Sequence, residues 1–374
     1  MNKPDSHIHK LIDKMMCSDT SFAIYRLPWT DIPLLVMQDG GSPQTFSSLK
    51  ELNGQKGFVI SPFSFTNEHP GVIIRPDITA TGWDGISEKI SSFTISESDT
   101  EQKCSSTDID IKPETELKEK YMEVFANFIS PLRNGKIGKL VLSRNASYKL
   151  NDNFSPLEAF VTACNSYPRM MISLSHTPVS GTWIGSTPEI ILSGEGDTWN
   201  TVALAGTMPM HGEVMPTEWH KKEKDEQAFV SEYINKVIKK FSSKIAVKGP
   251  YTARAGQLVH LRTDFQFGLK KTSELGNLLD ALHPTPAVCG MPKDKAYDFI
   301  IENEGYDRKY YSGIIGWLDP DGHTTLYVNL RCLNVNGNYA TLYAGGGILP
   351  SSDANSEWEE TQHKMNTIRL VISC

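Results

Sequence analysis

One group of residues that could carry chemistry consists of charged side chains in helix-like segments. In EWEETQHK, offsets of three and then four residues put Glu357, Glu360 and Lys364 on one face of a helix. Glu226 lies in a second such segment, KDEQAFV. The structural alternative is a solvated helix face, with a Glu360–Lys364 ion pair worth only a few tenths of a kcal/mol. Spacing alone does not show whether these residues act in catalysis or ligand binding, or only form a solvated helix face.

Polar residues and glycines in strand-like segments form a second group of candidates. They are Lys139 in GKLVLSR, Glu189 in GSTPEIIL, Gly206 and Thr207 in ALAGT, His260 in LVHLRT, Arg331 in YVNLRC, and Gly345 and Gly346 in YAGGG. A lysine such as Lys139 commonly extends from a strand edge into solvent, and Glu189 could be a solvated carboxylate at a strand end. Glycines after a strand reduce stability unless the backbone turns sharply or approaches a ligand closely.

The common cofactor and catalytic motifs are absent from the sequence. GxxxxGK[ST], GxGxxG after a strand, HExxH and GxSxG do not occur, which disfavours nucleoside-triphosphate chemistry, a Rossmann cofactor and a zincin-type zinc site. The six cysteines lie far apart with no CxxC pair. This spacing argues against a zinc site and a disulfide framework, and predicts buried or incidental thiols.

Composition and charge describe an ordinary globular protein. Hydrophobic residues make up 39% of the 374 residues, and charged residues make up 22%. The net charge is -7, and no cluster of Lys and Arg interleaved with aromatics suggests nucleic-acid binding. No run approaches the roughly 20 apolar residues of a membrane span, and the start lacks the apolar core of a secretion signal. We therefore expect no nucleic acid, no membrane and a cytoplasmic location.

Hydrophobic periodicity predicts an α+β fold with large antiparallel sheets packed together and helices on the outside. Strands are expected within 21–75, 136–150, 170–209 and 257–269. Helices are expected at 114–132, 156–166, 217–241, 272–282, 293–304 and 354–371. A polar loop is expected at 94–113, and a meander at 311–349 with turns at DPDG and NGN.

A proline-rich loop, ALHPTPAVCGMP at 281–292, completes a series of segments that resembles one family. Taken in order, KLVLSR, TPEIIL, LAGT, LHPTPAVCGMP, NLRC, YAGGGI and EWEET resemble the chorismate-utilising enzymes, and among them most closely the isochorismate synthases. The resemblance covers residues 115–374, whereas residues 1–110 resemble nothing that we can place. It implies one chorismate-binding catalytic domain over residues 1–374, made of a variable N-terminal part and a motif-bearing part.

The resemblance also implies a reaction and roles for two candidates. Chorismate would become isochorismate by addition of water at ring carbon 2 and loss of the hydroxyl at carbon 4. Lys139 matches the general base, which requires a neutral amine near pH 7 through burial or neighbouring positive charge. Glu189 matches the general acid, which must hold a proton near pH 7. The two side chains are expected on opposite sides of the ring.

A magnesium site and a binding site for the substrate dianion are implied in the same way. Glu226 and Glu360 match Mg²⁺ ligands, and Glu357 matches a carboxylate that reaches the ion through water. The residues that match the substrate-binding set are Gly206, Thr207, His260, Ala287, Arg331, Gly345, Gly346 and Lys364. Arg331 can hold a carboxylate with two parallel hydrogen bonds, and backbone N–H groups around Gly345 and Gly346 can donate.

The sequence departs from the family pattern at two positions. Gln227 follows Glu226 where relatives often carry histidine or asparagine, which weakens the assignment of Glu226. Gly346 is alanine in many relatives, which is a mild change.

Two other functions stay open. A salicylate synthase would form isochorismate and then eliminate pyruvate, but its loop resembles TxTASG more than PTPAVCG. A catalytically silent chorismate-binding subunit is disfavoured by the presence of the base, the acid and the three carboxylates.

The amine-inserting relatives carry glutamine at position 139 or a lysine nucleophile near position 287. Lys139 and Ala287 therefore predict that water is the nucleophile and that no glutamine amidotransferase subunit takes part. A monomer is expected. The sequence does not decide whether the product feeds menaquinone, siderophore or salicylate synthesis, nor whether His260 and His283 contact the ligand.

Overall fold

The computed structural model describes residues 6–93, 109–210, 215–216, 218–255 and 258–372, and within them two nine-stranded antiparallel sheets form the fold. Sheet A has the order β14 (Gly290–Met291), β7 (Lys139–Lys149), β18 (Tyr339–Ile348), β17 (Cys332–Asn336), β9 (Gly181–Thr187), β8 (Met171–Thr177), β1 (Phe22–Arg26), β2 (Leu34–Met37) and β6 (Ile78–Thr81). Sheet B has the order β12 (Ile245–Ala255), β13 (Leu258–Phe267), β11 (Thr198–Pro209), β10 (Ile190–Glu195), β16 (Thr324–Val328), β15 (Ile314–Leu318), β4 (Gly57–Ser61), β5 (Gly71–Ile74) and β3 (Gln44–Phe46).

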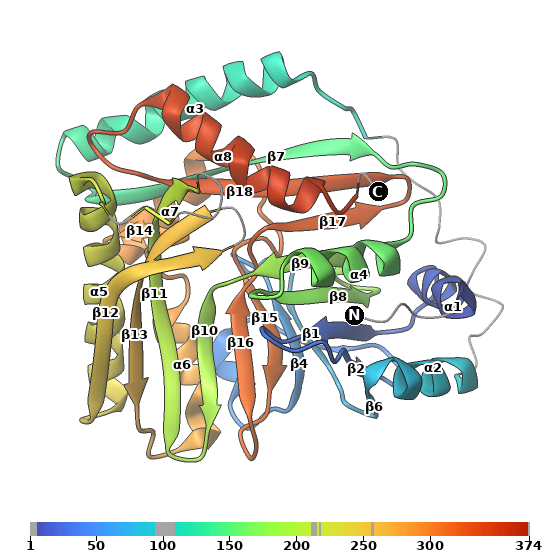
Figure 1. The fold of residues 1–374 in the computed structure, drawn as a ribbon. Helices are drawn as coiled ribbons and strands as arrows, with labels where there is room; N and C mark the ends of the chain where they lie inside the picture. The colour runs from blue at the N-terminus through green and yellow to red at the C-terminus, as the bar shows by residue number, and fades with distance from the viewer. Residues whose placement is uncertain (1–5, 94–108, 211–214, 217, 256–257, 373–374) are drawn as a thin grey trace.

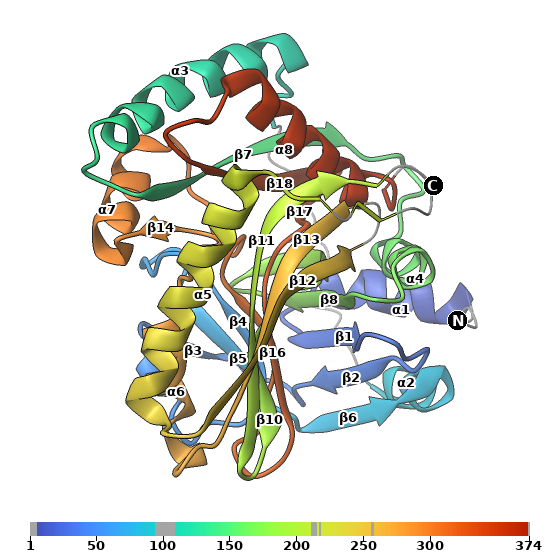
Figure 2. The same cartoon turned by 60° about the vertical axis from the view of Figure 1, so that its left-hand side comes forward.

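Helices cover the outer faces of both sheets, and the strands of the two sheets cross one another (Figure 1). Over sheet A lie α3 (Glu114–Arg133), α8 (Ala354–Arg369), α4 (Pro156–Ser166), α1 (Ser6–Met16) and α2 (Gly82–Ser92). Over sheet B lie α5 (Lys221–Phe241), α6 (Leu275–Leu282) and the short 3-10 helices Leu49–Leu52 and Thr272–Glu274. The remaining helix, α7 (Lys293–Asn303), packs beside β14 and β7. Figure 2 shows α5 and α6 together on one side, and α1, α2 and α4 together on the other.

Between the sheets lies a core that is rich in aromatic side chains. The rings of Trp183 and Tyr343 stack at a centroid distance of 5.5 Å, and the rings of Tyr311 and Tyr343 also stack at 5.5 Å. All three rings are almost fully buried. Trp183 and Tyr343 come from sheet A, whereas Tyr311 immediately precedes β15 of sheet B, so the stack ties the two sheets together.

Side-chain hydrogen bonds fix the starts of the two helices that carry the candidate carboxylates, α8 and α5, in different ways. Asp353 caps α8, because its carboxylate accepts a hydrogen bond from the N–H of Ser356. In α5, Gln227 is 2% exposed, and its amide donates to Ala203 O and Thr263 Oγ1. These bonds fix the first turns of α5 against β11 and β13.

The α+β fold with two antiparallel sheets confirms the prediction from periodicity. The predicted meander at 311–349 is wrong in one respect, because β15 and β16 join sheet B whereas β17 and β18 join sheet A. Helices α1 and α2 and strand β12 were not predicted. Most of the predicted loop at 94–113 lies outside the described residues.

The cysteines and the helices bear on two further expectations. Cys164, Cys289 and Cys332 are buried free thiols, as expected, but Cys17 is disulfide-bonded, so the expectation of thiols is wrong there. Among the helices of the described residues, none has the length and apolar character needed to span a bilayer.

Candidate active site

A cavity of about 650 Å³, counting its open mouth, lies where the two sheets meet. Sheet A contributes Val141 and residues 343–347, and sheet B contributes residues 204–207 and His260. The candidate residues that line it are Glu189, Gly206, Thr207, Glu226, His260, Ala287, Arg331, Gly345, Gly346 and Lys364. Lys139, Glu357 and Glu360 lie behind this lining.

Glu189 is a buried carboxylic acid at the start of β10. It is 4% exposed, and Val328 N donates to its carbonyl, which fixes the backbone against β16. Burial raises the pKa of Glu189 to about 7, although the positive charges of Lys139, Lys364 and Arg331 act in the opposite direction. The carboxyl group therefore keeps its proton to a large extent near neutral pH, which is the property expected of a general acid.

Lys139, the first residue of β7, is fully buried behind the cavity lining. Its Nζ lies 3.0 Å from Glu226 Oε1, without the geometry of a hydrogen bond. For a neutral amine at Lys139 we expected either burial or a neighbouring positive charge. The structure shows burial, but the neighbouring charged group is a carboxylate.

Gly347 makes that contact sterically possible. A Cβ atom at this position would lie 2.1 Å from Glu226 Oε1 and 3.0 Å from Lys139 Cε. Any larger residue would therefore have to displace the Glu226 carboxylate. The close approach explains why a glycine stands here in the middle of a strand.

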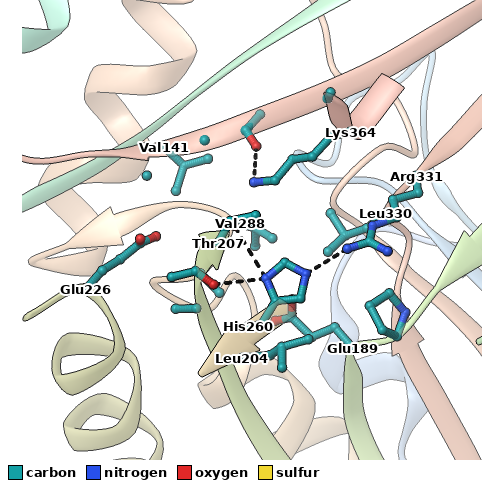
Figure 3. Close-up of a pocket in the computed structure, with 18 of the residues that line it drawn as sticks. Val141, Glu189, Leu204, Thr207, Glu226, His260, Val288, Leu330, Arg331 and Lys364 are labelled. Atoms are coloured by element: carbon teal, nitrogen blue, oxygen red, sulfur yellow. Dashed lines mark hydrogen bonds between the residues drawn. The ribbon is translucent and has the colours of Figure 1, made fainter. Parts of the chain in front are cut away.

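Arg331 and His260 form a hydrogen-bonded pair, seen at the centre of Figure 3. His260 Nδ1 lies 3.0 Å from Gly206 O, and because a carbonyl only accepts, Nδ1 carries the proton. Nε2 then accepts from Arg331 Nη2 at 2.7 Å. Burial, with the charges of Arg331 and Lys364, lowers the pKa of His260 well below its usual range, so the ring is neutral. His260 thus lines the cavity and also orients Arg331.

Unusual backbone conformations place both members of this pair. Arg331 has a φ of +47°, in the left-handed region, at the turn that carries the chain from β16 in sheet B to β17 in sheet A. Gly206 has a φ of +71° at a register shift in the β11–β13 ladder, which allows its carbonyl to face His260. The Thr207 hydroxyl lies 3.4 Å from the same ring nitrogen.

Register determines which glycine N–H groups of β18 face away from β7. Gly345 is opposite Ser143 and Gly347 is opposite Val141. The N–H groups of Ser143 and Val141 donate elsewhere, so these are non-hydrogen-bonded pairs. Lys364 Nζ donates to Gly345 O at 2.9 Å, on this open side. Gly345 and Gly347 therefore present N–H groups there, whereas the N–H of Gly346, named as a donor from sequence, points toward β7.

Three carboxylates surround the glycines of β18, and each contacts a lysine. Glu226 contacts Lys139, Glu360 contacts Lys364 at 2.7 Å, and Glu357 contacts Lys222 at 2.5 Å. A Cβ atom on Gly346 would lie 3.3 Å from Glu357 Oε2, on the opposite face of the strand from Glu226. Within the described part of the chain, no three acidic, histidine or cysteine side chains are close enough to form a ready-made metal site.

These carboxylates nevertheless provide the oxygen donors that Mg²⁺ prefers. Glu357 is 1% exposed, and its Oε2 has no hydrogen-bond partner among the residues that the structure describes. Burial and the neighbouring Glu360 raise the pKa of Glu357 to about 7. Such an orphaned buried oxygen is what a cation would satisfy.

Sequence reasoning missed several residues of this region. Glu223 lies one turn before Glu226 on α5, and within the described part of the chain its buried Oε2 is also without a hydrogen-bond partner. The offset of three residues between them, the same as between Glu357 and Glu360, was the available signal. Lys222 and the cavity-lining Tyr311 and Tyr343 were missed as well. Nothing in their spacing distinguishes them from surface or core residues.

Comparison with known proteins identifies the family. Residues 53–373 match the family model described as chorismate binding enzyme. The chain belongs to this family. The match begins at residue 53, inside the part of the chain where we found no motif. Membership in the chorismate-binding enzymes confirms the resemblance in the sequence motifs.

Relatives within the chorismate-binding family include several isochorismate synthases. Isochorismate synthase EntC of Escherichia coli K12 is 32% identical over 206 residues, which cover 52% of this chain and 53% of EntC. Isochorismate synthase DhbC of Bacillus subtilis 168 is 28% identical over 273 residues, which cover 69% and 68%. The chain spans about half the length of several curated relatives that it matches.

A solved structure shows that the fold is shared. MenF, the menaquinone-specific isochorismate synthase from Escherichia coli, has a TM-score of 0.78 at 21% identity, over 99% of this chain and 92% of MenF.

Proposed function

We propose that this chain is an isochorismate synthase, which converts chorismate to isochorismate. The observation that carries the proposal is a buried acid in the cavity, Glu189, whose pKa is raised to about 7. Such an acid is protonated to a large extent near neutral pH and can protonate a departing hydroxyl. Arg331 and Lys364 line the same cavity and provide positive charge for a substrate with two carboxylates.

The proposed reaction is an acid–base exchange across the ring. Lys139 takes a proton from water as the water oxygen bonds to carbon 2, and the ring double-bond electrons shift toward carbon 4. The bond from carbon 4 to its hydroxyl breaks, and Glu189 gives its proton to the leaving oxygen, which departs as water. The role of Lys139 requires its contact with Glu226, at 3.0 Å, to open in the reacting complex so that the amine can reach the water.

A Mg²⁺ ion held by Glu226 and Glu360, with Glu357 acting through water, is part of the proposal. The support is the set of oxygen donors from α5 and α8 and the orphaned oxygens of Glu357 and Glu223. When bound, the ion would supply positive charge for a substrate carboxylate. Glu223 would add a fourth oxygen donor to the set.

Water is proposed as the only nucleophile. Ala287 and Val288 are the residues of the proline-rich loop that line the cavity, and neither side chain carries an amine. We accordingly propose that the chain works without a glutamine amidotransferase subunit. That it is a monomer stays a prediction.

The decisive experiment is chromatography of the products that the purified full-length chain forms from chorismate. With Mg²⁺ we expect isochorismate, and with Mg²⁺ removed by a chelator we expect unchanged chorismate. Salicylate with pyruvate would instead identify a salicylate synthase. Binding of chorismate without conversion would identify a silent binding subunit. The matched control is Glu189→Gln, which should bind substrate without converting it.

A further inference from the structure

A fully buried ion pair lies beneath one wall of the cavity. Arg308 and Glu304 are 3% and 4% exposed, and two guanidinium nitrogens donate to the two carboxylate oxygens, Nε to Oε2 at 2.5 Å and Nη2 to Oε1 at 2.7 Å. Glu304 Oε1 also accepts from the N–H and hydroxyl of Ser143 on β7. Neither charged residue lines the cavity, and the proposed chemistry uses neither of them.

Arg308 joins two walls of the cavity through its remaining N–H groups. Nη1 donates to Val288 O at 2.7 Å, and Nη2 donates to Val141 O at 2.9 Å. Val288 belongs to residues 283–289, the part of the proline-rich segment between α6 and β14, which we call the 283–289 loop. Val141 belongs to β7, and both valines line the cavity. One planar guanidinium therefore fixes the separation between these two walls.

The beginning of the same loop is linked to Arg308 through the ring of Phe63. The Arg308 guanidinium lies over the Phe63 ring at 4.3 Å from its centroid, and the His283 ring packs edge-on against Phe63 at 6.5 Å. His283 is 4% exposed and does not line the cavity. Both ends of the loop are thus held by Phe63 and Arg308, whereas Ala287, between them, faces the cavity.

We propose that Arg308 and Glu304 are positioning residues, which hold the 283–289 loop against β7 so that a bound ring is placed between Lys139 and Glu189. This inference rests on the proposed function. Only a planar fork can bind a carboxylate and two carbonyls at once, so a lysine would keep the charge and lose the placement. The expected consequence of the loss is slower chemistry with nearly unchanged binding, because the hydrogen bonds from Arg331 to His260 and from Lys364 to Gly345 do not involve this pair.

The test compares two arginine-to-lysine substitutions. For Arg308→Lys we expect kcat per folded molecule to fall about 10- to 100-fold and KM to change less than about threefold. The control is Arg26→Lys, because Arg26 is 1% exposed and donates to the carbonyls of Leu27, Cys164, Tyr167 and Pro168 but does not line the cavity. The control should lose stability and keep its kcat per folded molecule.

A pH profile separates positioning from a general loss of structure. The pKa of Glu189 is lowered by three nearby positive charges, those of Lys139 on β7, Lys364 on α8 and Arg331. Thr285 of the loop lies beside the Glu189 side chain. If the loop moves away, water reaches Glu189 and its pKa falls toward the ordinary value. The alkaline limb of kcat should then shift to lower pH in Arg308→Lys and stay in place in Arg26→Lys.

A milder variant and a second measurement keep the inference testable if Arg308→Lys fails to fold or the wild type proves inactive. Ser143→Ala deletes one hydrogen bond to Glu304 and should shift the same limb in the same direction. Hydrogen exchange at the Val288 and Cys289 amides, which donate to Thr285 O, should accelerate in Arg308→Lys or in Ser143→Ala, but not in Arg26→Lys. Inactive wild-type protein with this exchange pattern would refute the proposed function alone. Unchanged exchange, or equal losses of kcat in both arginine variants, would refute the positioning role.

Discussion

Glu189 and the three carboxylates between α5 and α8 meet positive charge in different ways. Glu189 lies under the influence of Lys139, Lys364 and Arg331, and burial still raises its pKa to about 7. Between α5 and α8, Glu226, Glu357 and Glu360 each contact the ammonium group of a lysine. Glu357 is intermediate, because burial and Glu360 raise its pKa to about 7 in spite of Lys222. The difference teaches that burial can raise the pKa of a carboxyl group in spite of nearby positive charge, as in Glu189, whereas a direct contact with Lys364 lowers the pKa of Glu360.

The strongest way to break the comparison is to remove the proton donor. In Glu189→Gln we expect kcat on chorismate to fall about 10³-fold, because the amide keeps the shape but cannot supply the proton. Steady-state kinetics measures the loss, and thermal unfolding checks the fold. The control is Glu195→Gln at the exposed end of the same strand, β10. Retention of more than about a tenth of the wild-type rate would contradict the assignment.

Removing the proposed base should have nearly as large an effect. In Lys139→Gln we expect a fall in kcat of about 10²- to 10³-fold, because the glutamine amide cannot accept a proton from water. The control is Lys149→Gln at the exposed end of β7. Comparable rates in the two variants would show that Lys139 is not the base.

The buried state of Glu189 also predicts how stability depends on pH. Its pKa is raised from 4.5 to about 7, so the folded state holds the proton more tightly than the unfolded state. The stabilisation is fully present below about pH 4.5 and is lost as the pH rises through about 7, by about 3 kcal/mol in total. Urea unfolding of wild type between pH 5 and 8 should show this slope, and Glu189→Gln should reduce it. An equal slope in both proteins would mean that Glu189 is not buried in its neutral form.

Substitution of Glu226 or Glu360 should change the Mg²⁺ dependence of activity more than it changes proton transfer. In Glu226→Gln or Glu360→Gln we expect the Mg²⁺ concentration for half-maximal activity to rise at least about tenfold. The rise in melting temperature on adding Mg²⁺ should shrink as well, which is a readout independent of turnover. Glu359→Gln, one residue away and exposed, is the control. The metal assignment fails if both variants respond to Mg²⁺ as the control does.

The smallest expected difference concerns two adjacent glycines of β18. In Gly347→Ala the new Cβ must displace the Glu226 carboxylate, and we expect kcat/KM to fall about fivefold to tenfold. In Gly346→Ala the nearest atom, Glu357 Oε2, would be 3.3 Å away, so the effect should stay below about threefold. Steady-state kinetics of the two variants, measured side by side, tests this difference. Equal effects would contradict the close approach of Glu226 to Gly347.

Much of this fold follows from local sequence signals. Helix α3 (Glu114–Arg133) and strand β7 (Lys139–Lys149) lie close to their predicted ranges, because each has apolar residues at its own period and clear end signals. Sheet membership was not predictable in the same way. The chain leaves sheet B at Arg331 through a left-handed backbone conformation of a residue that is not glycine.

The site was predictable from the order of motifs, but its electrostatics were not. Resemblance named Lys139 and Glu226 for different roles, whereas the structure puts them in contact. Residues that act through packing, such as Gln227, give no signal in a single sequence. Its position after Glu226 weakened the assignment, yet its buried amide fixes α5 beside the cavity.

The N-terminal strands complete both sheets, and this limits how the chain can be shortened. β1 pairs with β8 of sheet A, and β4 pairs with β15 of sheet B. A truncated chain that kept only the motif-bearing residues from 115 onward would expose the edges of β8 and β15 at once, and each would be a template for pairing with another chain. Such a fragment would also lack Phe63 beneath the 283–289 loop. We expect it to form insoluble aggregates on expression, so that the segment without recognisable motifs is indispensable in any minimal engineered version.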